Sequence, residues 1–371
     1  MRLSVLDRSR TRQGEEPAQA LRDTVAFAQE AEQLGYHRFW VSEHHGVPGV
    51  AGSAPTVLAA AVAAATTRIR VGTGGVMLPN HRPMVVAEQF GVLASLFPGR
   101  IDMGLGRSVG FTDGVRRALG REKDAADDFG AQLVELLGYF DGSQQVHRGV
   151  HARPAEGLRV PAFVLATGAG ADLAADAGLP LVVAATRGEE RMPAAIDRYR
   201  AGFRPSAQAA QPYVVIAGTV AVAGTAESAR ELLIPEAWAG AYSRTHGEFP
   251  PLAPAAEIAA LSMGARERAA YEQSLKGHIA GTPEQAAAEL AALMARSGAD
   301  EFLVTTSTYD RAALLDSYRL LARAVGQPVG QGVGQPVGQS AAQGVATRAA
   351  GREAAGPEDV DRTVAQAVGR A

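Results

Sequence analysis

Residues 39–45 read Phe39-Trp40-Val41-Ser42-Glu43-His44-His45, a short apolar run followed directly by three ionisable side chains. A run of this length bounded by polar residues is typical of a buried strand. In barrels of parallel strands, the side chains that do chemistry lie where strands end, at the carboxyl face of the barrel. The stretch therefore predicts a strand that delivers Glu43, His44 and His45 to a catalytic face. In the alternative interpretation, one of the two histidines caps the following loop and the other is packed against the protein.

The chain around this stretch alternates short apolar runs with longer helical patterns, which indicates repeated βα units and a parallel sheet. The expected strands are Arg2–Leu6, Arg38–Ser42, Ile69–Leu78, Ile101–Leu105, Ala162–Ala166, Leu181–Ala185, Tyr213–Val222 and Glu301–Thr306. The expected helices are Ala18–Leu34, Pro55–Thr66, Met84–Leu96, Asp128–Phe140, Gly170–Ala177, Met192–Phe203, Pro283–Arg296 and Arg311–Val325. Eight alternations predict an α/β protein with one (β/α)8 TIM barrel over residues 1–325. Periodicity alone leaves an open, doubly wound sheet as the structural alternative.

Two connections are longer than the rest, Gly106–Arg121 and Gly224–Gly281, and we expect both to enlarge the loops around the catalytic mouth. From Gly326 the composition changes, and Gly326-Gln327-Pro328-Val329 is echoed by Gly334-Gln335-Pro336-Val337. Such low-complexity sequence cannot bury a core. We therefore expect residues 326–371 to form a largely disordered tail.

Composition excludes several classes of function. The 371 residues carry a net charge of -3, which gives no electrostatic basis for binding nucleic acid or an anionic membrane. Cysteine is absent, so disulfides, thiolate nucleophiles, zinc fingers and iron–sulfur clusters are excluded. No third ligand at a recognisable spacing accompanies His44 and His45, so no metal site is predicted. The longest apolar run, Val57–Ala65, is too short to span a bilayer, and we expect a cytoplasmic protein.

A glycine-rich segment, Val71–Pro79, interrupts an otherwise good strand with Gly72, Gly74 and Gly75. Glycines inside a strand mark a bulge or the close approach of another group. Two explanations of the segment remain open. A flat cofactor ring lies against the bare backbone, or the segment is a bulge that is needed only for barrel closure.

Two further strand ends suggest contacts to an anion. Arg107 follows the strand Ile101–Leu105 and suits a phosphate or carboxylate clamp, with a surface ion pair as the alternative. The glycines around it run G-x-G-x-x-x-G, one residue off the dinucleotide fingerprint. The segment Thr167-Gly168-Ala169-Gly170 opens directly into a helix, so its backbone N–H groups suit a phosphate, or it forms an ordinary tight turn.

Taken together and in this order, these segments resemble the bacterial luciferase-like flavin-dependent monooxygenases over about residues 1–325. The match is carried by Trp40–His45, Val71–Pro79 and Phe97–Arg107, and by Gly281–Glu284 followed by Gly298–Glu301. The resemblance implies a (β/α)8 barrel that holds a flavin at its carboxyl mouth.

The resemblance also implies roles for individual residues. His44 and Glu43 correspond to the catalytic histidine and the acidic residue beside the flavin, so we expect His44 to handle protons and Glu43 to orient it or the flavin. Because neighbours on a strand face opposite ways, only one of His44 and His45 is expected to meet the flavin. The Gly74–Gly75 bond falls where the family often has a non-prolyl cis peptide.

At the phosphate end, Arg107 and the turn from Thr167 through Gly168 and Ala169 to Gly170 correspond to the family's phosphate-binding groups. The turn departs from the family pattern, because relatives usually carry serines where this chain has Gly168, Ala169 and Gly170. A second basic position of the family is occupied by Asp127-Asp128. Weak phosphate binding suits a protein that borrows its flavin.

The leading interpretation is a two-component monooxygenase that takes FMNH2 from a separate flavin reductase and oxygenates a small organic substrate, in a tailoring step of secondary metabolism. The first alternative is hydride transfer with the deazaflavin F420, whose acidic tail would favour Arg107, Arg116, Arg117 and Arg121. The second is a non-catalytic flavin-binding relative.

The helix Pro55–Thr66 is apolar nearly all round, which a solvent-facing barrel helix should not be. Relatives dimerise through helices in this region, so the resemblance implies a homodimer. In the alternative explanation, an insertion loop of the same chain covers this helix.

Overall fold

The computed structural model describes residues 1–166, 170–185 and 191–327. The predicted tail, 326–371, lies outside these residues except for Gly326 and Gln327. No helix in the described part of the chain combines the length and apolar character needed to cross a membrane.

Parallel strands form a closed barrel in the order β3-β2-β1-β11-β8-β7-β6-β5-β4, and a further pairing of β3 with β5 closes the ring. The strands are β1 (Arg2–Asp7), β2 (Arg38–Val41), β3 (Arg70–Thr73), β4 (Val76–Met77), β5 (Ile101–Gly106), β6 (Ala162–Leu165), β7 (Leu181–Ala184), β8 (Val214–Gly218) and β11 (Glu301–Val304). Both β3 and β4 pair with β5, so they form one barrel strand interrupted at Gly74 and Gly75. The predicted (β/α)8 barrel is confirmed, and the open sheet is excluded.

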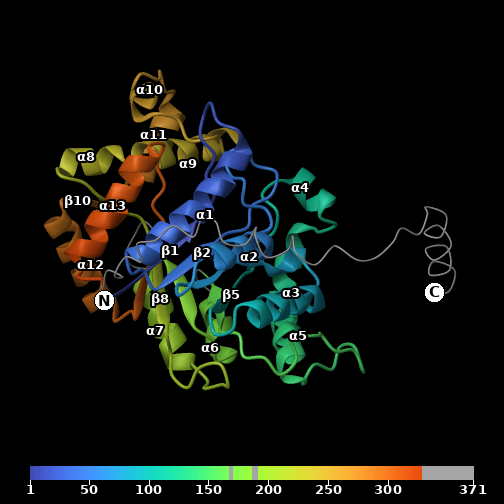
Figure 1. Ribbon diagram of the computed structural model, residues 1–371. Helices are drawn as coiled ribbons and strands as arrows, with labels where there is room; N and C mark the ends of the chain where they lie inside the picture. The colour runs from blue at the N-terminus through green and yellow to red at the C-terminus, as the bar shows by residue number, and fades with distance from the viewer. Residues whose placement is uncertain (167–169, 186–190, 328–371) are drawn as a thin grey trace, which may run out of the picture. The chain divides into compact units, whose positions relative to one another are not determined.

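Helices surround the barrel on its outside (Figure 1). They are α1 (Pro17–Gln33), α2 (Pro55–Ala65), α3 (Pro83–Leu96), α5 (Phe129–Asp141), α6 (Gly170–Asp176), α7 (Arg191–Gly202), α12 (Pro283–Ser297) and α13 (Arg311–Ala324). Each lies within a residue or two of its predicted range. Apolar periodicity places these helices well because one face of each packs on the sheet.

One predicted strand is wrong in part. The run Tyr213–Val222 is two strands, β8 and β9 (Val220–Val222), and β9 leaves the barrel to pair in parallel with β10 (Ile279–Gly281). Side chains that follow β11 in sequence stabilise the departure of β9 from the barrel. The N–H of Val220 donates to Thr306 Oγ1, and the N–H of Val222 donates to Ser317 Oγ. The sequence gives no sign of the break, because the run is apolar throughout.

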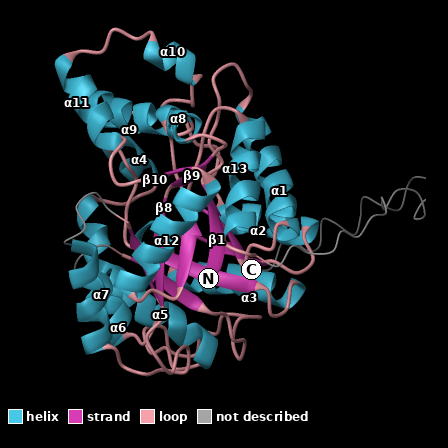
Figure 2. Ribbon diagram, turned by 90° about the vertical axis from the view of Figure 1, so that its left-hand side faces the viewer, coloured by secondary structure: helices cyan, strands magenta, loops and turns pink. Residues whose placement is uncertain are grey.

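The two long connections fold into elements of their own. The first contains α4 (Asp113–Ala118) and is followed by the 3-10 helix η2 (Lys123–Asp128), whereas the 3-10 helix η1 (Leu78–Asn80) directly follows β4. The second contains α8 (Ala226–Glu231), α9 (Ile234–His246), α10 (Ala255–Ala259) and α11 (Ala265–Ser274). Figure 2 shows α8 to α11 gathered at one end of the barrel.

The barrel interior is layered, because alternate residues of each strand point inward. One layer is apolar and consists of Leu6, Trp40, Phe163, Val182, Val215 and Leu303. On the amino side lies a buried ionic layer, in which Arg38 bridges Asp102 at 2.7 Å and Glu301 at 3.1 Å. These layers fill the barrel interior beneath the strand ends.

Candidate active site

A pocket of about 400 Å³ opens at the carboxyl ends of β2, β4, β5 and β6. Its walls are Ser42, Glu43, His44, His45, Val47, Gly74, Gly75, Met77, Gly106, Ser108, Val109, Gly110, Phe111, Leu165 and Phe249. The structure thus brings together four of the residues singled out in the sequence, Glu43, His44, Gly74 and Gly75.

The chain leaves the sheet at Val41, and Ser42–His45 form no strand. The backbone N–H of His44 donates instead to the carbonyl oxygen of Gly52 at 2.9 Å. Strand alternation therefore does not apply here, and both His44 and His45 line the pocket. The reason given for expecting only one of them to meet the flavin therefore does not hold, and the expectation itself stays a prediction.

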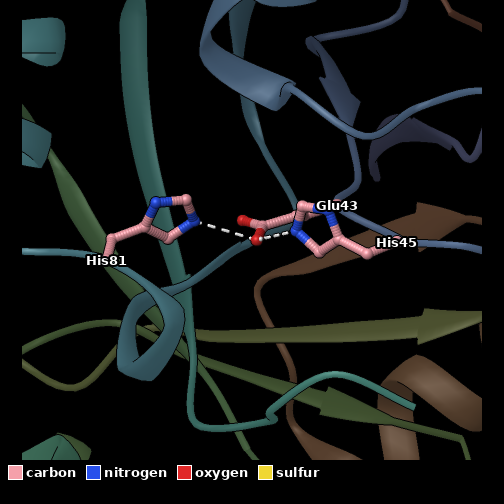
Figure 3. A group of neighbouring side chains, drawn as sticks. All are labelled: Glu43, His45 and His81. Atoms are coloured by element: carbon pink, nitrogen blue, oxygen red, sulfur yellow. Dashed lines mark hydrogen bonds and ion pairs between the residues drawn. The ribbon is translucent and has the colours of Figure 1, made fainter. Parts of the chain in front are cut away.

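Glu43 lies between two histidines from different segments (Figure 3). Its Oε1 is 2.7 Å from Nε2 of His45 and 2.9 Å from Nε2 of His81, while Oε2 accepts the backbone N–H of Met77 at 2.8 Å. The structure shows no hydrogen bond between the described side chains of Glu43 and His44. Glu43 instead contacts His45 and His81, and its expected role in orienting the flavin stays a prediction.

His81 was missed in the sequence, although a signal existed. It follows the glycine-interrupted strand at the end of η1, so the reasoning about strand ends that selected Glu43 applies to it as well. The spacing argument against a third ligand was too narrow, because His81 is near in space and distant in sequence. The ligand-type atoms of Glu43, His45 and His81 all lie within 4.8 Å of one another.

The carboxylate of Glu43 is ionised by its surroundings. Burial alone would raise its pKa, but the hydrogen bonds from His45 and His81, the charge of His81 and the N–H of Met77 lower the pKa to about 2. The side chain of Glu43 is fully enclosed, whereas those of His45 and His81 are 18% and 30% exposed. The pocket therefore has a fixed negative charge beneath two partly accessible imidazoles.

His44 has a different environment. Burial lowers its pKa to about 4, and the nearby charges of Arg8 and Arg10 add to that effect against the opposing charges of Glu236 and Glu43. Its Nδ1 lies 3.2 Å from Ser42 Oγ. At neutral pH His44 is an uncharged imidazole.

Backbone forms the wall contributed by β4 and β5. The Gly74–Gly75 peptide bond is cis, as the resemblance implied. A Cβ on Gly75 would lie 2.7 Å from the carbonyl oxygen of Gly104, whereas one on Gly106 would meet only Val76 O at 3.9 Å. Gly75 is therefore required by strand packing, and Gly106 leaves open space beside the pocket. The packing interpretation of the glycine segment is confirmed at Gly75, and contact with a cofactor ring stays a prediction.

The predicted phosphate contacts are less completely described. Arg107 does not line the pocket; its Nη2 lies 3.6 Å from Asp127 Oδ1, and both side chains are well exposed. Thr167, Gly168 and Ala169 lie outside the described residues. Gly170 begins α6 and is buried, and a Cβ there would lie 2.5 Å from the Cβ of Ala166. Gly170 thus lets the helix start close to the end of β6.

The two long connections meet at the pocket, as expected for loops around the mouth. Phe111 comes from the first and Phe249 from the second, with ring centroids 5.9 Å apart in an edge-to-face arrangement. Arg10 lies over the ring of Phe249, with Cζ 5.6 Å from the centroid. Nothing in the sequence pairs these two phenylalanines.

A second cavity, of about 480 Å³, is lined by residues of α1 and α13. Its charged groups already have partners: Arg311 pairs with Asp23 and Glu15, and Nε of Arg12 donates to the carbonyl oxygen of Tyr309. Its walls contain no residue singled out in the sequence. The strand-end pocket is therefore the candidate active site.

The comparisons with known proteins all indicate the same family. The family model described as luciferase-like monooxygenase matches residues 1–301. A luciferase-like monooxygenase of Escherichia coli (strain K12) is 33% identical over 321 residues, covering 85% of this chain and 95% of the relative. The N-acetyl-S-alkylcysteine monooxygenase of Bacillus subtilis (strain 168) is 34% identical over 342 residues, covering 88% and 98%.

Solved structures share the fold. The crystal structure of apo-MsnO8 has a TM-score of 0.79 at 32% identity, covering 88% of this chain and 98% of that chain. Two more distant structures match in fold alone. The oxygenating constituent of 3,6-diketocamphane monooxygenase from Pseudomonas putida, in complex with FMN, has a TM-score of 0.65 at 17% identity, covering 88% and 98%. An F420-dependent secondary alcohol dehydrogenase has a TM-score of 0.64 at 16% identity, covering 87% and 98%.

Proposed function

Since the chain belongs to the luciferase-like monooxygenase family, we propose that it uses reduced FMN and molecular oxygen to oxygenate a small organic substrate. The family membership makes it an oxidoreductase and confirms the resemblance drawn from its strand-end motifs. The identity of the cofactor, the source of its electrons and the substrate are the parts we propose.

The observation that carries the proposal is the composition of the pocket at the barrel mouth. Bare backbone at Gly74, Gly75 and Gly106 leaves one wall without side chains, which suits a flat ring system, and the imidazoles of His44 and His45 share the space. Such a pocket, apolar with a few convergent polar groups, is typical of a cofactor site. A reduced flavin, when bound, supplies the electrons that activate oxygen.

The protein's own contribution is to bind, to exclude water and to manage protons. Phe111 and Phe249 line the pocket from two separate connections, and we propose that their rings limit the entry of bulk water. The apolar side chains of Val47, Met77 and Leu165 suit contact with an apolar part of a substrate. We therefore expect a substrate with an apolar segment.

We propose Arg107 as the contact to the flavin phosphate, together with the turn from Thr167 to Gly170. The pairing of Arg107 with Asp127 at 3.6 Å is exposed, and exposed ion pairs contribute little free energy. A doubly charged phosphate would compete well with that carboxylate. Modest affinity at this end favours a flavin delivered by a separate reductase in the cytoplasm.

F420 is the second candidate cofactor, because two structural neighbours are named as F420-dependent. Besides Arg107, which either cofactor could engage, two of the three arginines that would hold its acidic tail have partners within the protein. Arg116 pairs with Asp113 and donates to Gly110 O, and Arg121 donates to His81 O. These contacts favour FMN over F420.

An anaerobic titration tests the proposal. We expect FMNH2 to bind in preference to reduced F420, and admission of oxygen to convert an N-acetyl-S-alkylcysteine, the substrate class named for one relative, through its apolar S-alkyl chain. Binding of reduced F420 alone would replace monooxygenation with hydride transfer, and flavin binding without oxygen consumption would indicate a non-catalytic relative. Arg107→Ala should weaken FMNH2 binding by roughly 1.5–3 kcal/mol, the worth of a charge-assisted contact.

A further inference from the structure

Phe249 contributes to the pocket wall from a segment that has no helix or strand of its own. It lies between α9, which ends at His246, and α10, which begins at Ala255. Its ring is partly buried and lines the pocket together with Phe111. Side chains on such connections are held less precisely than those on helices and strands, so the position of this ring depends on contacts from elsewhere in the protein.

Arg10, which follows β1, provides these contacts. Its Cζ lies 5.6 Å from the centroid of the Phe249 ring, and its Nη2 donates to the carbonyl oxygen of Pro250 at 3.3 Å. Its Nη1 donates to the carbonyl oxygen of Gly49 at 2.7 Å, and the N–H of Gly49 donates to the carbonyl oxygen of Phe249 at 2.8 Å. One side chain thus contacts the ring, the backbone beside the ring and the connection that follows β2.

Gly49 shows how closely these segments approach one another. A Cβ on Gly49 would collide with the carbonyl oxygen of Pro250 and would lie 2.7 Å from Nη1 of Arg10. Arg10 itself is only 4% exposed. The segment around Phe249 therefore has no space to move toward Gly49.

The charge of Arg10 is paired with a carboxylate of α9. Its Nε donates to Oε2 of Glu236, in the first turn of that helix, at 3.0 Å, and Arg8 Nη1 lies 2.8 Å from the other oxygen of Glu236. Burial alone would raise the pKa of the Glu236 carboxyl, but the charges of Arg10 and Arg8 lower it. Arg10 therefore links the beginning of α9 to the segment that follows the end of α9.

Arg12 is a comparable arginine that lacks these contacts. It is 7% exposed, and it donates from Nε to the carbonyl oxygen of Tyr309 at 2.6 Å and from Nη2 to that of Thr308 at 3.2 Å. Within the described part of the chain, its side chain makes no hydrogen bond or ion pair with residues 247–252. A role confined to the stability of the fold would apply to Arg10 and Arg12 alike, so a comparison of the two separates stability from positioning.

We propose that Arg10 is a positioning residue that fixes the ring of Phe249 in the pocket wall and so limits the size of the substrate that the pocket admits. The pocket has a volume of about 400 Å³, which the proposed flavin ring and the substrate share. A fixed aromatic ring in its wall therefore favours a short alkyl group over a long one. The selectivity rests on the proposed function, whereas the position of the ring is a property of the protein alone.

Fluorine NMR of the full-length protein with 4-fluorophenylalanine at position 249 alone tests the positioning step without any cofactor. The change in the ¹⁹F shift between H2O and D2O reports how far solvent reaches the ring, and it is measured within each variant, so the loss of a nearby charge cancels. In Arg10→Met this isotope shift should increase by about twofold or more, because the contacts to Phe249, Pro250 and Gly49 are lost.

The variants include a matched control and a second test. Arg8 keeps Glu236 paired in Arg10→Met, and Arg10→Gln, which also lacks the cation, decides the test if circular dichroism shows that Arg10→Met does not fold. Arg12→Met removes an equally buried guanidinium and should keep the isotope shift of the parent protein. An isotope shift that stays at the parent value without the Arg10 guanidinium, or that rises equally in Arg12→Met, would overturn the proposal.

A competition experiment tests the selectivity. In a single turnover with FMNH2, oxygen and equal concentrations of N-acetyl-S-methylcysteine and N-acetyl-S-hexylcysteine, the ratio of the two products gives the ratio of their kcat/KM values. The parent protein should favour the methyl compound, and the ratio should fall by about tenfold or more in Arg10→Met, since a hydrophobic pocket discriminates by roughly 10–200-fold per methylene. A variant that is only less stable forms less of both products and keeps their ratio, as Arg12→Met should.

An unchanged product ratio in Arg10→Met would overturn the role of Arg10 in selectivity. If the parent protein forms no product from either thioether, the proposed function fails, while the NMR result still decides whether Arg10 positions Phe249.

Discussion

At the scale of single residues, His44 and Glu43 are neighbours in sequence with opposite electrostatic environments. Burial keeps His44 uncharged, with a pKa of about 4, whereas donors converging on Glu43 keep it charged, with a pKa of about 2. One turn of chain after β2 thus places a neutral imidazole and a fixed carboxylate in the same pocket. Their separation into two roles could not be inferred from the motif.

The low pKa of His44 predicts acid lability. An unfolded chain protonates this side chain near pH 6.5, whereas the folded protein holds it neutral down to about pH 4. The unfolded state binds the additional proton between these values, so the free energy of unfolding should fall by roughly 3 kcal/mol as pH drops from 6.5 to 4. Urea denaturation at several pH values should show this slope, reduced in His44→Gln. Burial also lowers the pKa of His37, so His37 accounts for the slope that remains in the variant. Equal slopes in the parent protein and in His44→Gln would contradict the prediction.

Asp102 offers a second test at this scale. Its fully buried carboxylate accepts Arg38 Nη1 at 2.7 Å, Arg70 Nε at 3.0 Å and Trp40 Nε1 at 3.2 Å inside the barrel. Asp102→Asn leaves the Arg38 cation without its full partner and should cost about 3–5 kcal/mol of unfolding free energy. The exposed pair Arg319–Asp316 is the control, because Asp316→Asn should cost less than about 1 kcal/mol. Equal shifts in the denaturation midpoints of the two variants would mean that the buried ionic layer stabilises the protein no more than an exposed ion pair does.

At the scale of elements, the sequence predicted the barrel strands well because each apolar run ends at a polar residue where the strand ends. The prediction failed at Tyr213–Val222, where nothing in the apolar run shows that β9 leaves the sheet. It also failed just past Val41, where alternation was extended by four residues beyond the strand. His81 and Phe249 were missed because their proximity to Glu43 and Phe111 depends on how connections fold over the mouth.

The covering role of those connections is testable. Phe249 contacts Phe111 across the pocket, so Phe249→Ala should open the mouth to water and solutes. With oxidised FMN bound, iodide quenching of flavin fluorescence should increase by about twofold or more, and more of the reduced flavin should yield hydrogen peroxide instead of product. Phe249→Leu keeps an apolar cover and is the control. Equal quenching in the Ala, Leu and parent proteins would show that the pair does not shield the pocket.

At the scale of the whole molecule, the barrel leaves one set of apolar side chains exposed on adjacent helices. Val57 of α2 is 70% exposed, and Val85, Val92 and Leu96 of α3 are 45%, 47% and 65% exposed. The two helices are linked by the hydrogen bond from Thr56 Oγ1 to Gln89 Oε1. Among the described residues, no loop covers Val57.

We propose that this surface of α2 and α3 forms a homodimer interface. Large apolar side chains at spacings of seven and four on α3, beside alanines on α2, suit close helix packing between two copies. Val57→Asp with Leu96→Asp places unpaired carboxylates in that interface, each costing roughly 2 kcal/mol or more on burial, so the dissociation constant should rise by at least about 100-fold. Light scattering at micromolar concentration should give a dimer for the parent and a monomer for the double variant. Val146→Asp, at a site 63% exposed and outside α2 and α3, should remain dimeric, and a monomeric parent protein would rule the interface out.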